Sequence, residues 1–116
     1  MKKKSRVPKL TLKISYRLTG EIEWKELHDE KGNDWGEYID YFKNGNIQYR
    51  GFNRDDKQIG LWIKYNDDGS VYSNFYFSMI KPGKEISENE YKKELAKLRL
   101  GLIECPEFDI LIKDYE

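Results

Sequence analysis

The 116-residue sequence has one cysteine, one histidine and three prolines. A lone Cys105 excludes an intrachain disulfide framework and a cysteine metal cluster, so we expect a partly buried structural cysteine. His28 has no second histidine to assist it and stands in a polar stretch, so we expect it to be exposed in a loop. No glycine-rich phosphate loop occurs. The sequence thus predicts no catalytic, cofactor-binding or metal-binding residue and a protein that is not an enzyme.

The chain also lacks a run of about 20 apolar residues, so no transmembrane helix is expected. Basic residues without acids fill the N-terminus, and no apolar segment follows them as a secretory signal would require. We therefore expect residues 1–10 to be a basic, flexible start and the protein to be cytoplasmic.

Net charge is zero overall but is unevenly distributed. Lysine and arginine total 21, as do aspartate and glutamate, and residues 1–9 hold five of the basic side chains and no acid. Removing these five leaves 16 basic against 21 acidic residues in the rest of the chain. An acidic body argues against nucleic acid as a direct partner, because phosphate contacts need clustered lysine and arginine.

Three segments of the chain repeat one pattern. They read LKISYRLTGEIEW (12–24), EYIDYFKNGNIQY (37–49) and LWIKYNDDGSVYS (61–73). Each has Ile, one residue, Tyr, three residues, Gly, one residue, then Ile or Val. The matched positions are Ile14, Tyr16, Gly20, Ile22; Ile39, Tyr41, Gly45, Ile47; and Ile63, Tyr65, Gly69, Val71. Self-similarity at a fixed period of this length is typical of repeat architectures.

Each copy predicts a β-hairpin. Apolar residues alternate on both limbs, as in half-buried strands, and each turn carries a glycine that tolerates positive φ. Three hairpins in series predict an antiparallel meander of about six strands. Polar spacers at 28–34 and 53–58 would join the hairpins.

The C-terminal third predicts a helix that covers the sheet. Ser87 and Glu90 match a capping box. Tyr91, Leu95, Leu98 and Leu102 then form a helical stripe, with Gly101 as a possible C-cap. We expect a mainly β (α+β) fold, with a possible final strand at 108–115. Its parts would be residues 1–10, hairpin repeats over 11–77 (copies about 11–27, 36–52 and 60–76), and a helix and tail over 78–116.

The repeat resembles the MORN (membrane occupation and recognition nexus) repeat in its bacterial variant. Its Gly-x-Trp/Tyr-x-x-Tyr-x-x-x-Gly-x-Ile/Val pattern fits the copy from Gly36 to Ile47, and fits the copy from Gly60 to Val71 better. The first copy departs from it, with Thr11 and Lys13 in place of the glycine and the aromatic residue. The resemblance covers about residues 11–77, and it implies binding rather than catalysis.

Short bacterial proteins with such repeats are often similar to antitoxins or immunity proteins, which neutralise secreted toxins by binding them. The resemblance, the acidic body and the missing catalytic residues together favour an antitoxin that occludes the active site of a toxin domain, with a nuclease as the expected class. The alternative is a non-enzymatic repeat scaffold or a lipid-headgroup binder. The protein could be a monomer or, through exposed strand edges, a homodimer.

Candidate partner-binding residues are of two kinds. Strand alternation predicts one mixed face that carries Tyr38, Trp62 and Tyr72, which would be either a second packing surface or a set of interface anchors. Acidic loops and the tail would dock in a basic cleft of the toxin. These acids are Asp29, Glu30, Asp34, Asp55, Asp56, Glu104, Glu107, Asp109 and Asp114.

Overall fold

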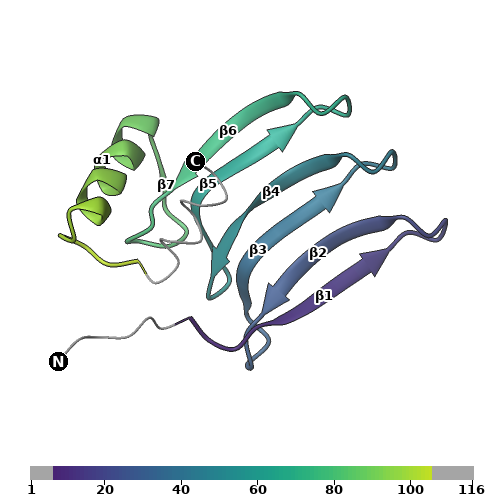
Figure 1. The fold of residues 1–116 in the computed structure, drawn as a ribbon, viewed down its shortest axis with the longest axis horizontal. Coiled ribbons are helices and arrows are strands. Elements are labelled where there is room, and N and C mark those ends of the chain that lie inside the picture. The colour runs from purple at the N-terminus through teal and green to yellow at the C-terminus, as the bar shows by residue number, and fades with distance from the viewer. Residues whose placement is uncertain (1–6, 106–116) are drawn as a thin grey trace.

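A computed structural model describes residues 7–105, which form one seven-stranded antiparallel sheet and one helix (Figure 1). The strands follow sequence order across the sheet: β1 (Thr11–Tyr16), β2 (Ile22–His28), β3 (Asp34–Tyr41), β4 (Ile47–Arg54), β5 (Lys57–Tyr65), β6 (Val71–Phe77) and β7 (Glu85–Ile86). Helix α1 (Glu88–Arg99) follows β7. The predicted mainly β meander with a C-terminal helix is confirmed. The possible strand at 108–115 and most of the basic N-terminus lie outside the described residues.

Four of the five hairpin turns between β1 and β6 share one geometry. In each, the first residue donates its N–H to the carbonyl of the fifth at 2.7–2.9 Å, and the glycine at the fourth position donates back to the first. This is a type I turn followed by a glycine in the left-handed region, which creates a bulge. The turns span 17–21, 29–33, 42–46 and 66–70, and their glycines have φ between 87° and 101°. The positive φ expected at the three repeat glycines is confirmed.

The polar spacers are tight turns rather than linkers. The stretch at 28–34 holds a fourth copy of the glycine turn, around Gly32. The stretch at 53–58 is mostly strand, and only Asp55 and Asp56 connect β4 to β5. Both have positive φ, 51° and 69°, as a two-residue type I′ hairpin turn requires. Every connection from β1 to β6 is therefore a short hairpin, and the turns alternate between the two ends of the sheet (Figure 1).

Neighbouring turns are tied to one another at the end where the repeat glycines lie. Asn44 Nδ2 donates to the carbonyl oxygen of Asp67 at 2.8 Å, which joins the β3–β4 turn to the β5–β6 turn. Arg17 donates to the carbonyl oxygen of Tyr41 at 2.7 Å and joins the first turn to β3. These bonds satisfy backbone carbonyls at the ends of strands and hold each hairpin against the next.

Strand register separates two faces of the sheet. Ile14, Lys25, Ile39, Arg50, Ile63 and Asn74 are successive cross-strand partners on one face, the Ile39 face. The opposite face, the Trp62 face, carries Trp24, Asp40, Tyr49, Lys64 and Ser73 in the same way. Tyr38 on β3 and Phe75 on β6 also belong to the Trp62 face.

The prediction that Tyr72 shares a face with Trp62 is wrong. The alternate residues that follow it on β6, Asn74 and Tyr76, pair with Ile63 and Leu61, so this side of β6 belongs to the Ile39 face. The register shifts by one residue between Lys64 and Tyr65 because the glycine turn introduces a bulge. A one-residue shift moves every later side chain to the other face.

Helix α1 packs against one edge of the sheet, at the β6–β7 side, and leaves β1 to β3 uncovered (Figure 1). The buried core beneath it consists of Phe52, Ile59, Met79, Leu98 and Cys105. Tyr91 and Leu95 pack against this core, as the helical stripe predicted, whereas Leu102 is exposed and Ile103 packs in its place. The chain leaves the helix at Leu100, so Leu102 no longer follows the helical period.

Polar contacts fix the start and the middle of α1. The predicted capping box is present, with the Ser87 side chain accepting from Glu90 N and the Glu90 side chain accepting from Ser87 N. Farther along, the Glu94 carboxylate accepts from Ser78 Oγ at 2.5 Å and from Met79 N at 2.7 Å. Hydrogen bonds to a charged acceptor are among the stronger ones in proteins. The Glu94 carboxylate on the helix therefore anchors α1 to the buried residues Ser78 and Met79, which follow β6.

Trp62 is the centre of a second packed layer, on the face named after it. Its side chain is 3% exposed, and Nε1 donates to the carbonyls of Phe52 at 3.1 Å and Ile59 at 3.2 Å. The rings of Tyr38, Tyr49 and Phe77 surround it at centroid distances of 6.1, 5.0 and 6.4 Å. The expectation that Trp62 binds a partner is therefore corrected: its indole is buried and its donor is satisfied. The reason is Gly51, which has no side chain and lets the indole settle on the backbone of β4.

Replacement of Gly51 by alanine should destabilise the fold strongly. An added Cβ would lie 1.9 Å from Trp62 Cδ2, in the middle of a buried ring. We expect a loss of about 3 kcal/mol or more in the free energy of unfolding, at the upper end of overpacking effects. Urea denaturation measures it.

Gly45→Ala serves as the control, because nothing lies within 4 Å of its Cβ position and only its φ of 91° is unfavourable. Its cost should stay near 1–2 kcal/mol. In a Trp62→Ala background the Gly51→Ala substitution should cost much less. Additive losses in this double-mutant cycle would contradict the steric explanation.

Candidate functional site at the acidic end of the sheet

Two acidic turns meet at the end of the sheet opposite the repeat glycines. The β2–β3 turn brings Asp34, and the β4–β5 turn brings Asp55 and Asp56. Asp34 N donates to Asp56 Oδ1 at 2.7 Å, and Asp56 N donates to the Asp34 carbonyl at 2.9 Å. Asn33 Nδ2 donates to Asp55 Oδ1 at 3.0 Å. Three hydrogen bonds thus join two turns that β3 and β4 separate in the sequence.

Asp29 shapes its own turn. Its Oδ1 accepts from Lys31 N at 3.0 Å and from Asn33 N at 2.9 Å. This is the local side-chain-to-backbone bonding that makes aspartate favourable in turns. Its carboxylate is therefore fixed in place.

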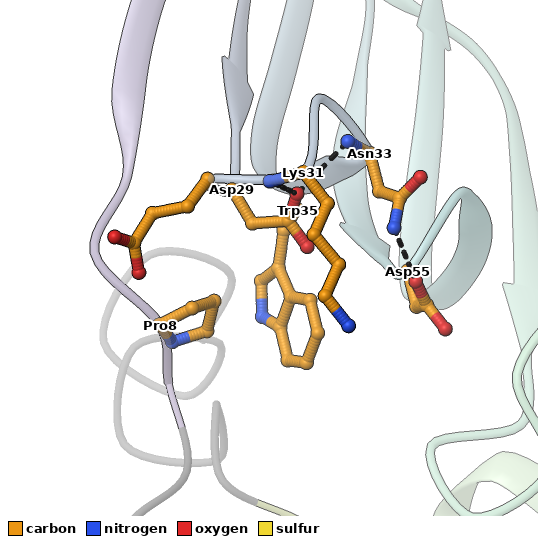
Figure 2. A pocket seen from close by; sticks show the side chains of 7 residues that line it. Pro8, Asp29, Lys31, Asn33, Trp35 and Asp55 are labelled. Atoms are coloured by element: carbon orange, nitrogen blue, oxygen red, sulfur yellow. Dashed lines mark hydrogen bonds between the residues drawn. The ribbon is translucent and has the colours of Figure 1, made fainter.

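A pocket of about 300 Å³ opens beside these turns. Figure 2 shows the Trp35 side chain between Pro8 and Asp55, which also line the pocket. Trp35 Nε1 is buried and has no hydrogen-bond partner in the described part of the chain. The lining residues are Pro8, Asp29, Glu30, Lys31, Asn33, Trp35 and Asp55. Three of the predicted acids, Asp29, Glu30 and Asp55, line it.

Sequence reasoning missed Trp35. It stands immediately before Gly36, which the repeat pattern used, but outside the pattern itself. Gly36 is buried with φ at 116°, and a Cβ there would lie 2.7 Å from Leu27 Cδ1. The Leu27 side chain and the positive φ together explain why glycine is favoured at position 36.

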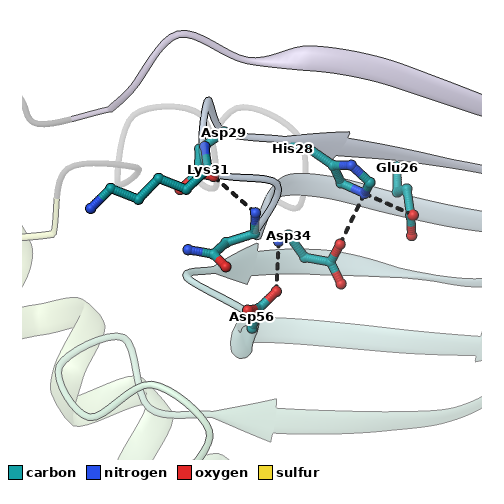
Figure 3. Close-up of polar contacts among 7 residues, drawn as sticks. Glu26, His28, Asp29, Lys31, Asp34 and Asp56 are labelled. Atoms are coloured by element: carbon teal, nitrogen blue, oxygen red, sulfur yellow. Dashed lines mark hydrogen bonds and ion pairs between the residues drawn. The ribbon is translucent and has the colours of Figure 1, made fainter.

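A histidine between two carboxylates lies next to the pocket, on the Trp62 face. His28 Nε2 is 2.8 Å from Glu26 Oε1 and 3.1 Å from Asp34 Oδ1 (Figure 3). The pKa of Asp34 is raised, first by partial burial and then by the charge of Glu26. The prediction of an exposed loop histidine is wrong. Strand β2 continues through His28, and a register shift between Glu26 and His28 brings the imidazole against β3.

The polar strip continues along β3. Tyr38, the cross-strand partner of Glu26, donates its hydroxyl to Asp40 Oδ2 at 3.1 Å. Burial raises the pKa of both side chains. Asp40 Oδ1 is buried and has no hydrogen-bond partner in the part of the chain that the structure describes. An ionised Asp40 therefore lacks full solvation in the folded state.

The remaining candidates are not brought to this end. Tyr72 is 69% exposed near the start of β6, beside the turn at the opposite end of the sheet. Tyr38 is half-buried within the aromatic cluster on Trp62. Glu104 is exposed after the helix. Glu107, Asp109 and Asp114 lie outside the described residues. Five acids thus converge, namely Asp29, Glu30, Asp34, Asp55 and Asp56.

A comparison with protein-family models found no match, and comparisons with curated proteins and with solved structures also found none. The resemblance to MORN repeats therefore stays a prediction. Among residues 7–105, no helix is long and apolar enough to cross a membrane.

Removal of the Asp40 charge should stabilise the protein at neutral pH. Because the pKa of Asp40 is raised in the folded state, folding favours its protonated form. The loss in the free energy of unfolding that ionised Asp40 causes is absent below the unfolded-state pKa. It grows as pH rises through the folded-state pKa. Asp40→Asn should therefore melt at a higher temperature than the wild type at pH 7, with the difference shrinking toward pH 4.

Thermal melts at several pH values test this expectation. Asp67→Asn, which removes an exposed carboxylate in the β5–β6 turn, controls for the change in net charge. An Asp40→Asn effect that is independent of pH, or that matches the Asp67→Asn effect, would refute the linkage.

Proposed function

We propose that this chain is an antitoxin or immunity protein that binds a cognate toxin domain and occludes its active site. The class of toxin that we propose is a nuclease. The observation that carries the proposal is the acidic end of the sheet, where carboxylates surround the Trp35 pocket. The serial β-hairpins add support, since they match the repeat whose resemblance first suggested this class. In this proposal the protein is not an enzyme and acts by binding alone.

The acidic end suits a basic cleft. A nuclease must attract phosphates, so its active site presents lysine and arginine, and carboxylates can take the place of the phosphates. Complementary charge of this kind speeds the encounter of two proteins and sets their orientation.

The carboxylates at this end are held before any partner arrives. Asp29, Asp55 and Asp56 each accept a hydrogen bond at Oδ1 from another residue of these turns or from the start of β3. A partner therefore does not have to order these side chains, and a smaller entropic cost of binding means higher affinity.

Trp35 offers an anchoring surface within the charged rim. The indole is flat and apolar, and Asp29 and Asp55 lie on the pocket wall around it (Figure 2). An arginine or lysine of the partner can place its apolar stem against the ring and its charge near the carboxylates. The lipid-headgroup alternative gains nothing from this end, because carboxylates repel anionic lipids.

In this proposal the neighbouring gene encodes the toxin domain, and co-expression of the two proteins tests the function directly. We expect cells that make both proteins to grow and cells that make the toxin domain alone to die. Equal killing with and without this protein would overturn the proposal. The purified pair should also form a stable complex in size-exclusion chromatography.

Neutralisation of charges at the pocket should slow association with that domain. Glu30→Gln with Asp55→Asn removes two charges but keeps the Asp55 oxygen that accepts from Asn33, and asparagine tolerates the positive φ at 55. We expect the association rate at low salt to fall about tenfold with unchanged stability. Surface plasmon resonance at two salt concentrations measures it.

The matched control is Asp67→Asn, an exposed turn acid at the other end of the sheet. It should leave the association rate within about twofold of the wild type. Equal effects of the pocket and control variants would place the interface elsewhere.

A further inference from the structure

We propose that Glu26, His28 and Asp34 form a binding site for a divalent transition-metal ion, of which zinc is the best match. The site lies on the Trp62 face, where β2 meets β3 (Figure 3). It goes beyond toxin binding and does not depend on it.

Three ligand atoms already converge there. Glu26 Oε1, His28 Nε2 and Asp34 Oδ1 all lie within 4.8 Å of one another. In a tetrahedral zinc site with bonds near 2.0–2.2 Å, ligand atoms are roughly 3.3–3.6 Å apart. His28 Nε2 stands 2.8 and 3.1 Å from the two oxygens, so shifts of roughly half an ångström would admit an ion.

A single proton on His28 Nε2 cannot satisfy both carboxylate oxygens fully. Both carboxylate oxygens approach the same imidazole nitrogen, which can carry only one hydrogen. Without a cation between them, the two negative charges remain close together on neighbouring strands. A divalent ion would take a lone pair from each of the three atoms and balance both charges.

The ligand set selects the class of ion. Imidazole suits zinc, copper, iron and nickel, and carboxylate oxygens are common additional ligands of zinc. Calcium and magnesium prefer all-oxygen sites, so His28 argues against them. Three protein ligands leave one position for water or for a partner's side chain.

The ligands are positioned by the sheet. Glu26 and His28 are two residues apart on β2, and Asp34 is the cross-strand partner of His28 on β3. The backbone N–H of Asp34 is held by Asp56 Oδ1 at 2.7 Å. The three side chains are 19%, 20% and 40% exposed, which leaves an ion a path from solvent.

The repeat itself does not require these residues. One period of 25 residues later, the positions of Glu26 and His28 hold Gly51 and Asn53. There the glycine accommodates Trp62, and no carboxylate or imidazole is present. The ligand set therefore occurs where the first copy joins the following spacer and is not repeated one period later, as expected for a site added to a repeated scaffold.

Zinc titration of the metal-free full chain tests the site, with isothermal calorimetry and a chromophoric chelator in competition. We expect one zinc ion per chain at micromolar affinity or tighter, and a higher melting temperature in its presence. His28→Gln should weaken binding at least about 100-fold, and Glu26→Gln or Asp34→Asn at least about tenfold. Asp55→Asn, a nearby acid outside the ligand set, and Cys105→Ser should bind as the wild type does.

NMR of the His28 imidazole in the wild-type chain covers the case in which a variant fails to fold. Zinc should shift its Nε2 resonance in a one-to-one titration. Affinity weaker than millimolar, an unshifted imidazole, or zinc binding that His28→Gln leaves intact would overturn the proposal. His28 would then serve only as the ion-pair partner of the two carboxylates.

Discussion

The register set by the glycine turns decides how the rest of this molecule is arranged. The turns around Gly20, Gly45 and Gly69, with their glycines in the left-handed region, are each accompanied by a one-residue register shift, which fixes which side chains of the next strand face which way. The turn around Gly69 places Phe75 opposite Trp62 and moves Tyr76 to the face that helix α1 contacts. Both packed layers, one under the helix and one around Trp62, follow from this offset.

The hairpins were predictable from sequence because their signals are local. Alternating apolar residues, a glycine at a fixed place and the Ser87–Glu90 capping box each act over a few residues. The spacers were harder to interpret because charged residues there have structural roles. Asp29 and Asn33 close a turn of the same kind as the repeat turns, although the repeat pattern does not include them.

The candidate site could be predicted only in part. The acids were recognisable as a set, but their convergence depends on antiparallel pairing that brings the turns at 29–33 and 55–56 together across two strands. Trp62 was misjudged because its burial depends on Gly51, a residue on another strand. His28 was misjudged for a similar reason, since a register shift between strands places it beside Asp34. Contacts between strands, such as these, cannot be predicted from the pattern of one segment alone.

In the β4–β5 turn, the carboxylates that carry the negative charge also form hydrogen bonds that hold the turn in place. Asp55 and Asp56 occupy a type I′ turn that asparagine and glycine would fill with less strain, yet each uses Oδ1 to hold the adjacent turn. Both side chains are exposed, so the residues that hold the two turns together also present negative charge to solvent. Backbone strain of this kind is often found at functional sites.

The two proposals meet at Asp34. Its N–H is bound by Asp56 of the acidic turn, while its carboxylate faces His28. An ion held by Asp34 would restrain the backbone from which the β2–β3 turn departs, and that turn carries Asp29 and Glu30 to the pocket. Metal binding would thereby add a further restraint to the surface that the toxin domain is proposed to contact. The coupling is reciprocal, so a partner that fixes this turn would also tighten the hold on the ion.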